Sequence, residues 1–339
     1  MKLARWKTLA GSLFLAAVLS VPAWGADTDN RHNAVPGTLN YVEGQASIDN
    51  QTLDSKSVGD AELQNGQILE TGNGKAEILL TPGVYLRIGD NSSVKMVSAN
   101  LTNTQLALDR GQAMLEVDQI YPQNNIQIRQ PGADTRVVKT GLYDFDSERQ
   151  LVRVFDGKAI VSLEDRNTTL KKGHELALNA EKLKAQGFNQ DQITKDDDLY
   201  RWSSLRSHYL SEANVDAANL YFANSWYGPG WWGPGWYWNP WFMGYTFLPG
   251  NGFFYNSFGW GFYSPLFAWR APYYGGLHGY HHFDGARPAA IGHGFRGNAV
   301  SHFQGGASMD GFRGGAAGFH GGAHVGGFGG FHGAGGGRR

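Results

Sequence analysis

Two carboxylates in the middle of the chain have the spacing that best suits catalysis. Asp144 and Asp146 are two positions apart in an apolar stretch, and alternation along a β-strand would place both on one face. Such a pair could protonate a glycosidic oxygen and activate water, as in enzymes that hydrolyse polysaccharides. However, carboxylates at i and i+2 are far more often a solvated strand face. We therefore expect no catalytic residue and keep a polysaccharide-acting enzyme as the lesser hypothesis.

Other reactive side chains do not form a recognisable motif. The acidic run at 196–198 lacks the spaced oxygen ligands and glycine of a calcium loop, so we interpret it as the acidic start of a helix. His278, His281 and His282 could gather around a metal, but a flexible chain would not hold them with ordered supporting hydrogen bonds. We expect no metal site and no cofactor.

Tryptophan is the most suggestive feature, because indoles combine a large apolar face with an N–H donor. Three interpretations stay open: packing on the protein's own β domain, stacking on the sugar rings of an envelope polysaccharide, and peripheral contact with a membrane surface. We expect removal of residues 225–339 to leave a folded β domain. The candidate binding residues are Trp226, Trp231, Trp232, Trp236, Trp238, Trp241, Trp260 and Trp269.

The first 25 residues have the pattern of a signal peptide. Basic residues at 2, 5 and 7 precede an apolar run from Leu9 to Val21, which is too short for a membrane-spanning helix. Small residues at 23 and 25 then predict cleavage before Ala26, with an uncleaved anchor as the alternative. We expect export to the periplasm, the outer envelope or the medium, and a flexible N-terminus over 26–37.

Charge divides the mature chain into two regions. Residues 26–224 carry 20 Lys/Arg and 28 Asp/Glu, whereas residues 225–339 carry six Arg, no Lys and two Asp. This footprint is too weakly basic for nucleic acid, so we expect no nucleic-acid partner. The chain has no cysteine, which excludes disulfides and thiolate chemistry.

Residues 38–180 show the short alternating runs of an all-β domain, with turns roughly every ten residues. Ala76, Ile78 and Leu80 share one face of a strand, and Lys75 and Glu77 lie on the other. Because this alternation predicts that each strand hides one face only, we expect antiparallel, water-facing sheets in a strand-stacking sandwich or solenoid-like fold. Arg153, by the same alternation, should face outward.

Two glycines mark expected turns in this domain. The sequence Thr81-Pro82-Gly83-Val84 has Pro and Gly at the central positions of a type II turn. Asp156-Gly157 lies between two apolar runs, which predicts a tight reversal with Gly157 at positive φ.

Residues 188–224 change to helical spacing. Thr194 and Asp197 resemble a capping box, and apolar residues recur to about Asn214, which predicts one amphipathic helix laid against the β domain. Beyond it, the Trp/Tyr/Gly/Pro-rich segment 225–274 loses regular periodicity. The Gly/His/Phe-rich tail 275–339 is expected to be disordered.

Five short motifs follow one another between about Val58 and Leu163. They are Gly66-Gln67-Ile68-Leu69-Glu70-Thr71-Gly72, Ala76-Glu77-Ile78-Leu79-Leu80, Leu86-Arg87-Ile88-Gly89, Leu108-Asp109-Arg110-Gly111-Gln112-Ala113 and Val154-Phe155-Asp156-Gly157-Lys158-Ala159. In these motifs and their order, the stretch resembles the FecR family of bacterial periplasmic domains. Where regulatory members have Gly-Thr-x-Phe, this chain has Thr140-Gly141-Leu142-Tyr143. The helix motif Tyr200-Arg201-Trp202-Ser203 is more like that of exported stand-alone members.

The resemblance implies a non-catalytic exported binding or scaffold protein, whose partner would be an envelope protein or polysaccharide. The alternative that it implies is a periplasmic sensor or regulatory partner in a FecR-type signalling pathway. We do not expect sigma-factor control by this chain, because the segments that hold a sigma factor and cross the membrane in regulatory members have no counterpart in the sequence.

Overall fold

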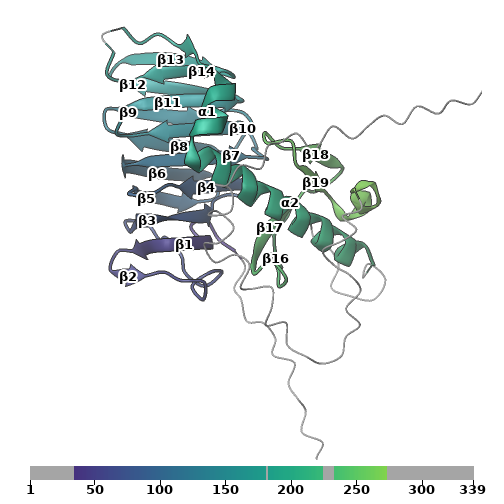
Figure 1. Cartoon of the computed structure of the whole chain (residues 1–339). Helices are drawn as coiled ribbons and strands as arrows, with labels where there is room; N and C mark the ends of the chain where they lie inside the picture. The colour runs from purple at the N-terminus through teal and green to yellow at the C-terminus, as the bar shows by residue number, and fades with distance from the viewer. Residues whose placement is uncertain (1–33, 181, 224–232, 273–339) are drawn as a thin grey trace, which may run out of the picture. The chain divides into compact units, whose positions relative to one another are not determined.

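The computed structural model describes residues 34–180, 182–223 and 233–272 (Figure 1). Most of this part of the chain forms one 15-stranded sheet. Its strands are β1 (Leu39–Ile48), β2 (Gln51–Thr52), β3 (Ile68–Leu79), β4 (Val84–Ile88), β5 (Ser93–Asn100), β6 (Asn103–Arg110), β7 (Gln112–Val117), β8 (Asn125–Gln130), β9 (Ala133–Val137), β10 (Gly141–Asp146), β11 (Leu151–Asp156), β12 (Lys158–Leu163), β13 (Arg166–Lys171), β14 (His174–Ala177) and β15 (Gln186–Gly187).

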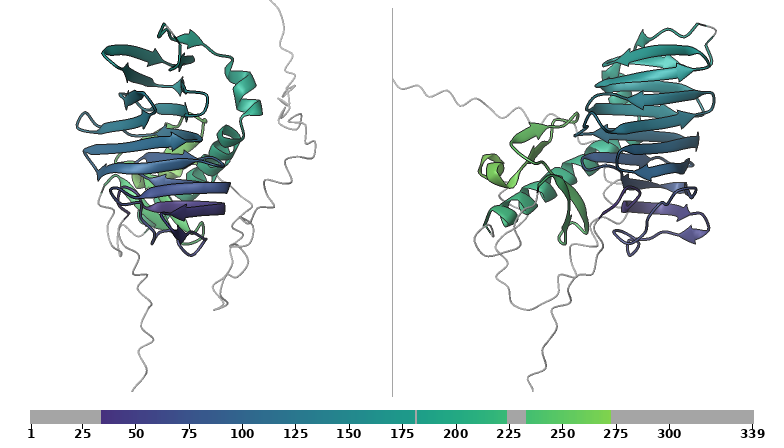
Figure 2. Two further views of the ribbon diagram at one scale, coloured as in Figure 1. Left: turned by 90° about the vertical axis from the view of Figure 1, so that its left-hand side faces the viewer. Right: turned by 180° about the vertical axis from the view of Figure 1, so that it is seen from behind.

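The sheet has two halves that enclose one core. Neighbouring strands follow the order β13-β12-β9-β8-β6-β5-β3-β4-β7-β10-β11-β14-β15, with β1 beside β3 and β2 beside β1 (Figure 2). We call strands β13, β12, β9, β8, β6 and β5 the first half of the sheet, and strands β4, β7, β10, β11, β14 and β15 the second half. Strand β3 lies between the two halves. Leu106 and Val161 of the first half and Leu115 and Val152 of the second belong to one buried cluster. All pairs are antiparallel except β6 with β8. The expected all-β strand-stacking fold is confirmed.

Two glycines carry the chain from one half of the sheet to the other. Gly111 separates β6 from β7, and Gly157 separates β11 from β12; in both cases the two strands pair with different neighbours rather than with each other. Gly157 has φ 97°, as expected, but the tight reversal expected there is wrong: it is a crossing between halves. The turn at Pro82-Gly83 is confirmed, since Gly83 has φ 81° and Val84 N–H donates to Thr81 O at 2.8 Å.

Gly157→Ala should destabilise the fold strongly. A Cβ atom there would lie 2.2 Å from Tyr143 Oη and 2.6 Å from the backbone oxygen of Thr140, in addition to the strain of positive φ. We expect a loss of about 3 kcal/mol or more in the free energy of unfolding, measured by urea denaturation. Gly66→Ala is the matched control, because Gly66 has φ 88° with nothing within 4 Å, and it should lose only about 1 kcal/mol. Equal losses would contradict the packing argument.

The outer face of the second half is covered, so the expectation of water-facing sheets is wrong there. Every residue of β4 and β10 is buried, whereas β6 and β8 of the first half keep the alternation of one hidden face. Leu79 and Tyr85 on the outer face pack in one cluster with Leu210 and Phe247. A second apolar layer therefore lies over the middle of the sheet.

Part of this layer is helical. The structure has α1 (Gln190–Asp196) and α2 (Asp198–Ala223) where the sequence predicts one helix, and α2 continues well past Asn214. The expected capping box is also wrong. Thr194 lies inside α1 and donates to Asp191 O, and it is Asp197 whose Oδ1 accepts from Tyr200 N–H at 2.8 Å to cap α2. In the described ranges, no helix is long and apolar enough to cross a membrane.

The rest of the layer comes from the aromatic segment, which has more regular structure than its sequence predicts. Two hairpins pack against α2 and are followed by a short 3₁₀ helix (Figure 1). These elements are β16 (Gly235–Asn239), β17 (Gly244–Leu248), β18 (Phe253–Tyr255), β19 (Gly261–Tyr263) and η2 (Pro265–Arg270). The predicted signal peptide, the predicted flexible N-terminus up to residue 33 and the predicted disordered tail lie outside the described residues.

Candidate functional site

The candidate tryptophans divide into three groups. Trp226, Trp231 and Trp232 lie outside the described residues. Trp236, Trp238 and Trp260 pack on the protein itself. Trp241 and Trp269 stay exposed, with 43% and 68% of their surface accessible. The structure therefore does not gather the described tryptophans into one surface.

The packed group supports the interpretation that the segment folds back on the β domain. The Trp236 ring meets Tyr85 edge-on at 4.9 Å, and the Trp238 ring meets Tyr245 at 5.0 Å. Trp260 stacks on His208 of α2 at 4.0 Å, and its Nε1 donates to the backbone of the same helix. These three indoles are structural contacts.

Three charged side chains form ion pairs where the sheet contacts the covering layer, and we call them the triad. The alternation of apolar and polar residues along the strands did not predict these ion pairs. Arg87 on β4 donates from Nε to Glu77 Oε2 at 2.7 Å and from Nη1 to Glu116 Oε2 at 2.6 Å. All three side chains have no exposed surface. Burying three charges is costly unless they pair and are fully hydrogen-bonded, so the layer that excludes water must also supply partners.

Both carboxylates of the triad bind the covering layer. Glu77 Oε1 accepts from Arg206 Nη2 of α2 at 2.9 Å. Glu116 Oε1 accepts from Ser207 Oγ of α2 at 2.9 Å and from Asn256 Nδ2, beside β18, at 2.5 Å. Glu116 is thus the point where the sheet, the helix and the second hairpin meet.

Asn40 connects the sheet to the first hairpin, which consists of β16 and β17, through buried hydrogen bonds. Its Nδ2 donates to Glu77 Oε1 at 2.8 Å and to Tyr245 O at 3.1 Å, and its Oδ1 accepts from Tyr245 N–H at 2.7 Å. The amide therefore satisfies a backbone donor and acceptor of β17 at once. We call Asn40, Glu77, Arg87, Glu116, Arg206, Ser207 and Asn256 the buried network.

Charge in the network is set by the two arginines. Burial raises the pKa of Glu77, but the Arg206 and Arg87 guanidiniums outweigh burial and bring this pKa down to about 2. Glu77 is therefore held as a carboxylate between two guanidiniums. The network is suited to holding the layer in place, because its side chains are almost completely buried and are bonded to one another across the sheet, the helix and the hairpins.

Asp144 and Asp146 do not form the paired site that the sequence allowed. Asp144 is 1% exposed and accepts from Arg153 Nη1 at 3.0 Å, so it is neither a solvated residue nor accessible to a substrate. Asp146 Oδ1 instead accepts from Arg149 N–H at 2.8 Å in a turn. Arg153, expected to face outward, is buried between Asp144 and Glu175.

Asp144 also connects the sheet to the start of α2 and should make stability depend on pH. Gln112 Nε2 donates to Asp144 Oδ1 at 2.9 Å and to Asp197 Oδ2 at 2.7 Å. Burial, helped by the Asp197 charge, raises the pKa of Asp144 from 3.8 to about 7. The folded protein thus holds this proton more tightly than the unfolded chain. The resulting stability is present below about pH 4 and is lost as the pH rises through about 7.

We expect Asp144→Asn to flatten the pH profile of stability by on the order of 1 kcal/mol per pH unit between about pH 4 and 7. Urea unfolding at several pH values measures this slope. Asp134→Asn is the control, because Asp134 is an exposed aspartate in a surface ion pair. If both variants keep the wild-type slope, the pH effect does not come from Asp144.

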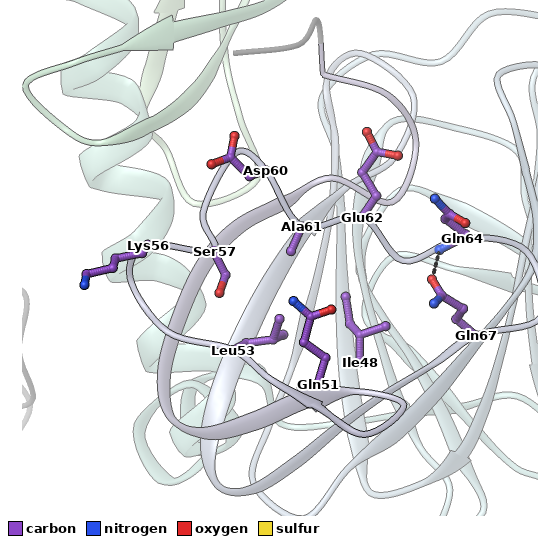
Figure 3. Close-up of a pocket in the computed structure, with 10 residues that line it drawn as sticks. All are labelled: Ile48, Gln51, Leu53, Lys56, Ser57, Asp60, Ala61, Glu62, Gln64 and Gln67. Carbon is purple, nitrogen blue, oxygen red and sulfur yellow. Dashed lines mark hydrogen bonds between the residues drawn. The ribbon is translucent and has the colours of Figure 1, made fainter. Parts of the chain in front are cut away.

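A cavity of about 450 Å³ opens at the β1 end of the stack (Figure 3). Gln67 Oε1 accepts from Gln64 N–H at 2.8 Å along its wall. The charged side chains of Lys56, Asp60 and Glu62 point away from the centre of the group in Figure 3. The lining therefore combines amide, apolar and charged side chains, and it contains no group of three His, Cys, Asp or Glu side chains placed to hold a metal ion among the described residues. Its other lining residues are Ile48, Gln51, Leu53, Ser57 and Ala61.

Within the described ranges, no three His, Cys, Asp or Glu side chains are placed to hold a metal ion. His278, His281 and His282 lie outside those ranges. His208, which is described, stacks on Trp260, and its Nε2 lies 3.3 Å from Glu212 Oε1 on the same helix, so its surroundings are structural contacts.

Residues 67–159 match the family described as FecR protein. Residues 67–159 are a FecR domain. It runs from the start of β3 into β12 and contains the triad Glu77, Arg87 and Glu116. Asn40, α2 and both hairpins lie outside the match. The buried network is therefore the connection between the FecR domain and the segments that flank it.

Two crystal structures from Parabacteroides distasonis, each described as a candidate anti-sigma factor, are similar to this chain. The sequence identities are 14% and 13%, and both have a TM-score of 0.33. Each match covers 38% of this chain and 62% of the other, so it takes in less than two thirds of those proteins. Among the curated proteins, none matches the chain significantly.

Proposed function

We propose that the protein is a non-catalytic, exported binding or scaffold module of the cell envelope, built on its FecR domain. The observation that carries this proposal is the exposure of Trp241 and Trp269 on a segment that is otherwise packed against α2 and the sheet. Exposed aromatic surface beside a packed core favours contact with a partner. Met243, two residues after Trp241, and Leu266, three residues before Trp269, are also exposed, at 48% and 59%.

The buried network gives these indoles a fixed support. Asn40 and Asn256 hold the two hairpins through buried hydrogen bonds to the sheet, so the backbone that carries Trp241 and leads to Trp269 is anchored before any ligand binds. Ordering before binding lowers the entropic cost of association. We favour an envelope polysaccharide as the partner, because a flat indole face can stack on the apolar face of a sugar ring. An envelope protein is the other partner that this surface suits.

The proposal is tested with Trp241→Ala and Trp269→Ala, alone and together, in the full chain. The variants are mixed with isolated envelope fraction, with purified envelope polysaccharide and with lipid vesicles, and the sedimented protein is measured before and after a high-salt wash. We expect the double variant to bind about tenfold more weakly, to polysaccharide or to envelope protein. Leu101→Ala is the control, because Leu101 is 52% exposed on the β5–β6 turn of the FecR domain. Unchanged binding by the double variant would contradict the proposal.

A sensor or regulatory partner in a FecR-type pathway is the second candidate function, and the FecR match over 67–159 favours it. In that case the partner would be another envelope protein rather than a polysaccharide. Crosslinking in living cells followed by mass spectrometry separates the two functions. Recovery of a signalling receptor or of a membrane-bound regulator supports the sensor, and its absence together with polysaccharide binding supports the binding module.

A further inference from the structure

The outer face of the first half of the sheet, unlike that of the second half, is accessible in the described part of the structure. Along β6, β8 and β12, buried residues alternate with residues that are at least partly exposed. Figure 1 shows β12, β9, β8, β6 and β5 stacked one below another. Because these strands pair in register, their outward side chains form rows that cross the sheet in steps of about 4.8 Å. One such row consists of Thr169, Ile160, Arg136, Gln127 and Gln105.

The charged residues on the strands of the first half are mostly basic, although residues 26–224 as a whole are acidic. These charged residues are Lys95, Asp109, Arg110, Arg129, Asp134, Arg136, Lys158, Arg166 and Lys171. Three of the basic side chains are paired with carboxylates: Arg110 with Glu70, Arg129 with Asp134, and Arg166 with Glu164. Among the described residues, the other basic side chains of these strands form no ion pair. The uncompensated charge of this face is therefore positive, which favours an anionic partner.

The positive charge is concentrated at one end of the face. Lys158 on β12 lies directly opposite Lys171 on β13, and like charges at opposed positions of two strands repel each other. Arg136 on β9 lies opposite Ile160, which is the next outward residue after Lys158 along β12. We call Arg136, Lys158 and Lys171 the basic cluster. An anion bound between these side chains would offset their repulsion.

Four amide side chains continue from the basic cluster across the face. Gln127 on β8 lies opposite Arg136, and the parallel pair of β8 with β6 places Asn125 beside Asn103 and Gln127 beside Gln105. Asn103 Oδ1 accepts from Asn125 Nδ2 at 2.7 Å and from Gln105 Nε2 at 2.8 Å. Asn125 Oδ1 accepts from Gln127 Nε2 at 3.0 Å. We call these four residues the amide ladder. Its side chains are partly exposed and keep further N–H and carbonyl groups for a ligand.

We propose that this face binds an acidic polysaccharide, whose anionic groups pair with the basic cluster and whose hydroxyl groups bond to the amide ladder. The inference rests on the proposed function, in which a polysaccharide is the favoured partner, and adds the charge of that polymer and a site for it. Amides both donate to and accept from hydroxyl groups, and rows at the regular spacing of strands suit a polymer with a repeating unit. An anionic membrane suits the face less, because a membrane-binding surface places apolar side chains beside its cations. The exposed large apolar residues here, Val97 and Leu101, lie on or after β5, away from β12 and β13.

The primary measurement is isothermal titration of the full chain with polygalacturonate, an acidic polysaccharide, and with dextran, a neutral one. Sedimentation with phosphatidylglycerol vesicles tests a membrane surface as the source of the anionic groups. We expect binding to polygalacturonate that weakens as the salt concentration rises, and no binding to dextran. Absence of binding to polygalacturonate, equal binding to dextran, or binding to the vesicles alone overturns the proposal.

The triple variant Arg136→Gln, Lys158→Gln and Lys171→Gln should bind polygalacturonate about tenfold more weakly, because it removes the three cations of the basic cluster. The matched control removes the same charge from exposed lysines elsewhere and should leave binding nearly unchanged. This control carries Lys56→Gln, Lys184→Gln and Lys195→Gln. An equal loss in both triple variants would show that binding follows net charge alone and would overturn the site.

Gln127→Ala tests the amide ladder separately from charge. It should weaken binding to polygalacturonate by a few fold, because it removes an amide that would bond to hydroxyl groups. If Gln127→Ala binds like the wild type, the amide ladder is not part of the site.

The double variant of Trp241 and Trp269 distinguishes this site from the proposed function. If that variant loses envelope binding while the basic-cluster variant keeps all binding, the site on the sheet is wrong and the proposed function stands. If the basic-cluster variant alone loses binding to polygalacturonate, the site is supported and the role given to the exposed indoles is wrong.

Discussion

Arg87→Met should lower the free energy of unfolding by about 3–5 kcal/mol. The substitution keeps most of the apolar volume but leaves the Glu77 and Glu116 carboxylates buried beside each other with half of their positive charge removed. Arg206 still pairs with Glu77, whereas Glu116 keeps only the neutral donors Ser207 and Asn256. Urea or thermal denaturation of the full chain measures the loss, and the substitution should also loosen the hairpin that Asn256 holds.

Arg129→Met is the matched control for this experiment. Like Arg87, Arg129 pairs with a carboxylate on a neighbouring strand: its Nε lies 2.7 Å from Asp134 Oδ1. Its side chain, however, is 56% exposed. Exposed pairs contribute little, so the expected loss is about 0–1 kcal/mol. If Arg87→Met costs no more than Arg129→Met, the network does not hold the layer on the sheet.

The sequence allowed the strands of the first half to be predicted well, because β6 and β8 hide one face and expose the other, which is the pattern that alternation detects. The sequence could not show which polar strand faces are covered by α2 and the aromatic hairpins. Glu77 meets Arg206 across 129 residues, and Glu116 meets Asn256 across 140 residues. Such partners are set by tertiary packing, and a charged residue on a strand looks the same whether water or a helix lies above it. One available signal was the row of polar residues along α2, where Ser203, Arg206, Ser207, Ser211 and Asn214 are all buried.

The aromatic hairpins were missed for a different reason. Glycine and proline in the segment suggested a loss of regular structure, and this outweighed a short alternation that is visible in retrospect. Tyr245 and Phe247 flank Thr246 on β17, which is the alternation typical of a strand, although the structure buries every residue of β17. The interpretation of the tryptophans as self-packing therefore holds for three of the five described ones. Composition alone could not distinguish the three packed tryptophans from the exposed Trp241 and Trp269, because the exposure of each indole depends on where it lies relative to the ends of the strands.

A chain that ends at Asn224 should be much less stable than the full chain, contrary to the expectation drawn from the sequence. The truncation removes Tyr245, Phe247 and Phe262, which bury Leu79, Tyr85 and Leu210, and it takes the Asn256 partner from Glu116. Each buried aromatic contributes about 1.5–3 kcal/mol, although the ordering cost of the removed segment offsets part of this. We expect a lower unfolding midpoint, a less helical α2 and binding of a hydrophobic dye to the uncovered face.

A chain that ends at Pro272 is the control that separates stability from binding. It keeps both hairpins, η2 and every contact of the buried network, so its unfolding midpoint should match that of the full chain. If only the chain that ends at Asn224 loses envelope binding, the uncovered face of the sheet explains the loss as well as a missing ligand surface does. If the chain that ends at Pro272 also loses envelope binding, the binding belongs to residues 273–339. If the chain ending at Asn224 is as stable as the one ending at Pro272, the hairpins do not stabilise the sheet, and the hydrogen bond from Asn256 to Glu116 adds nothing to the stability of the buried network.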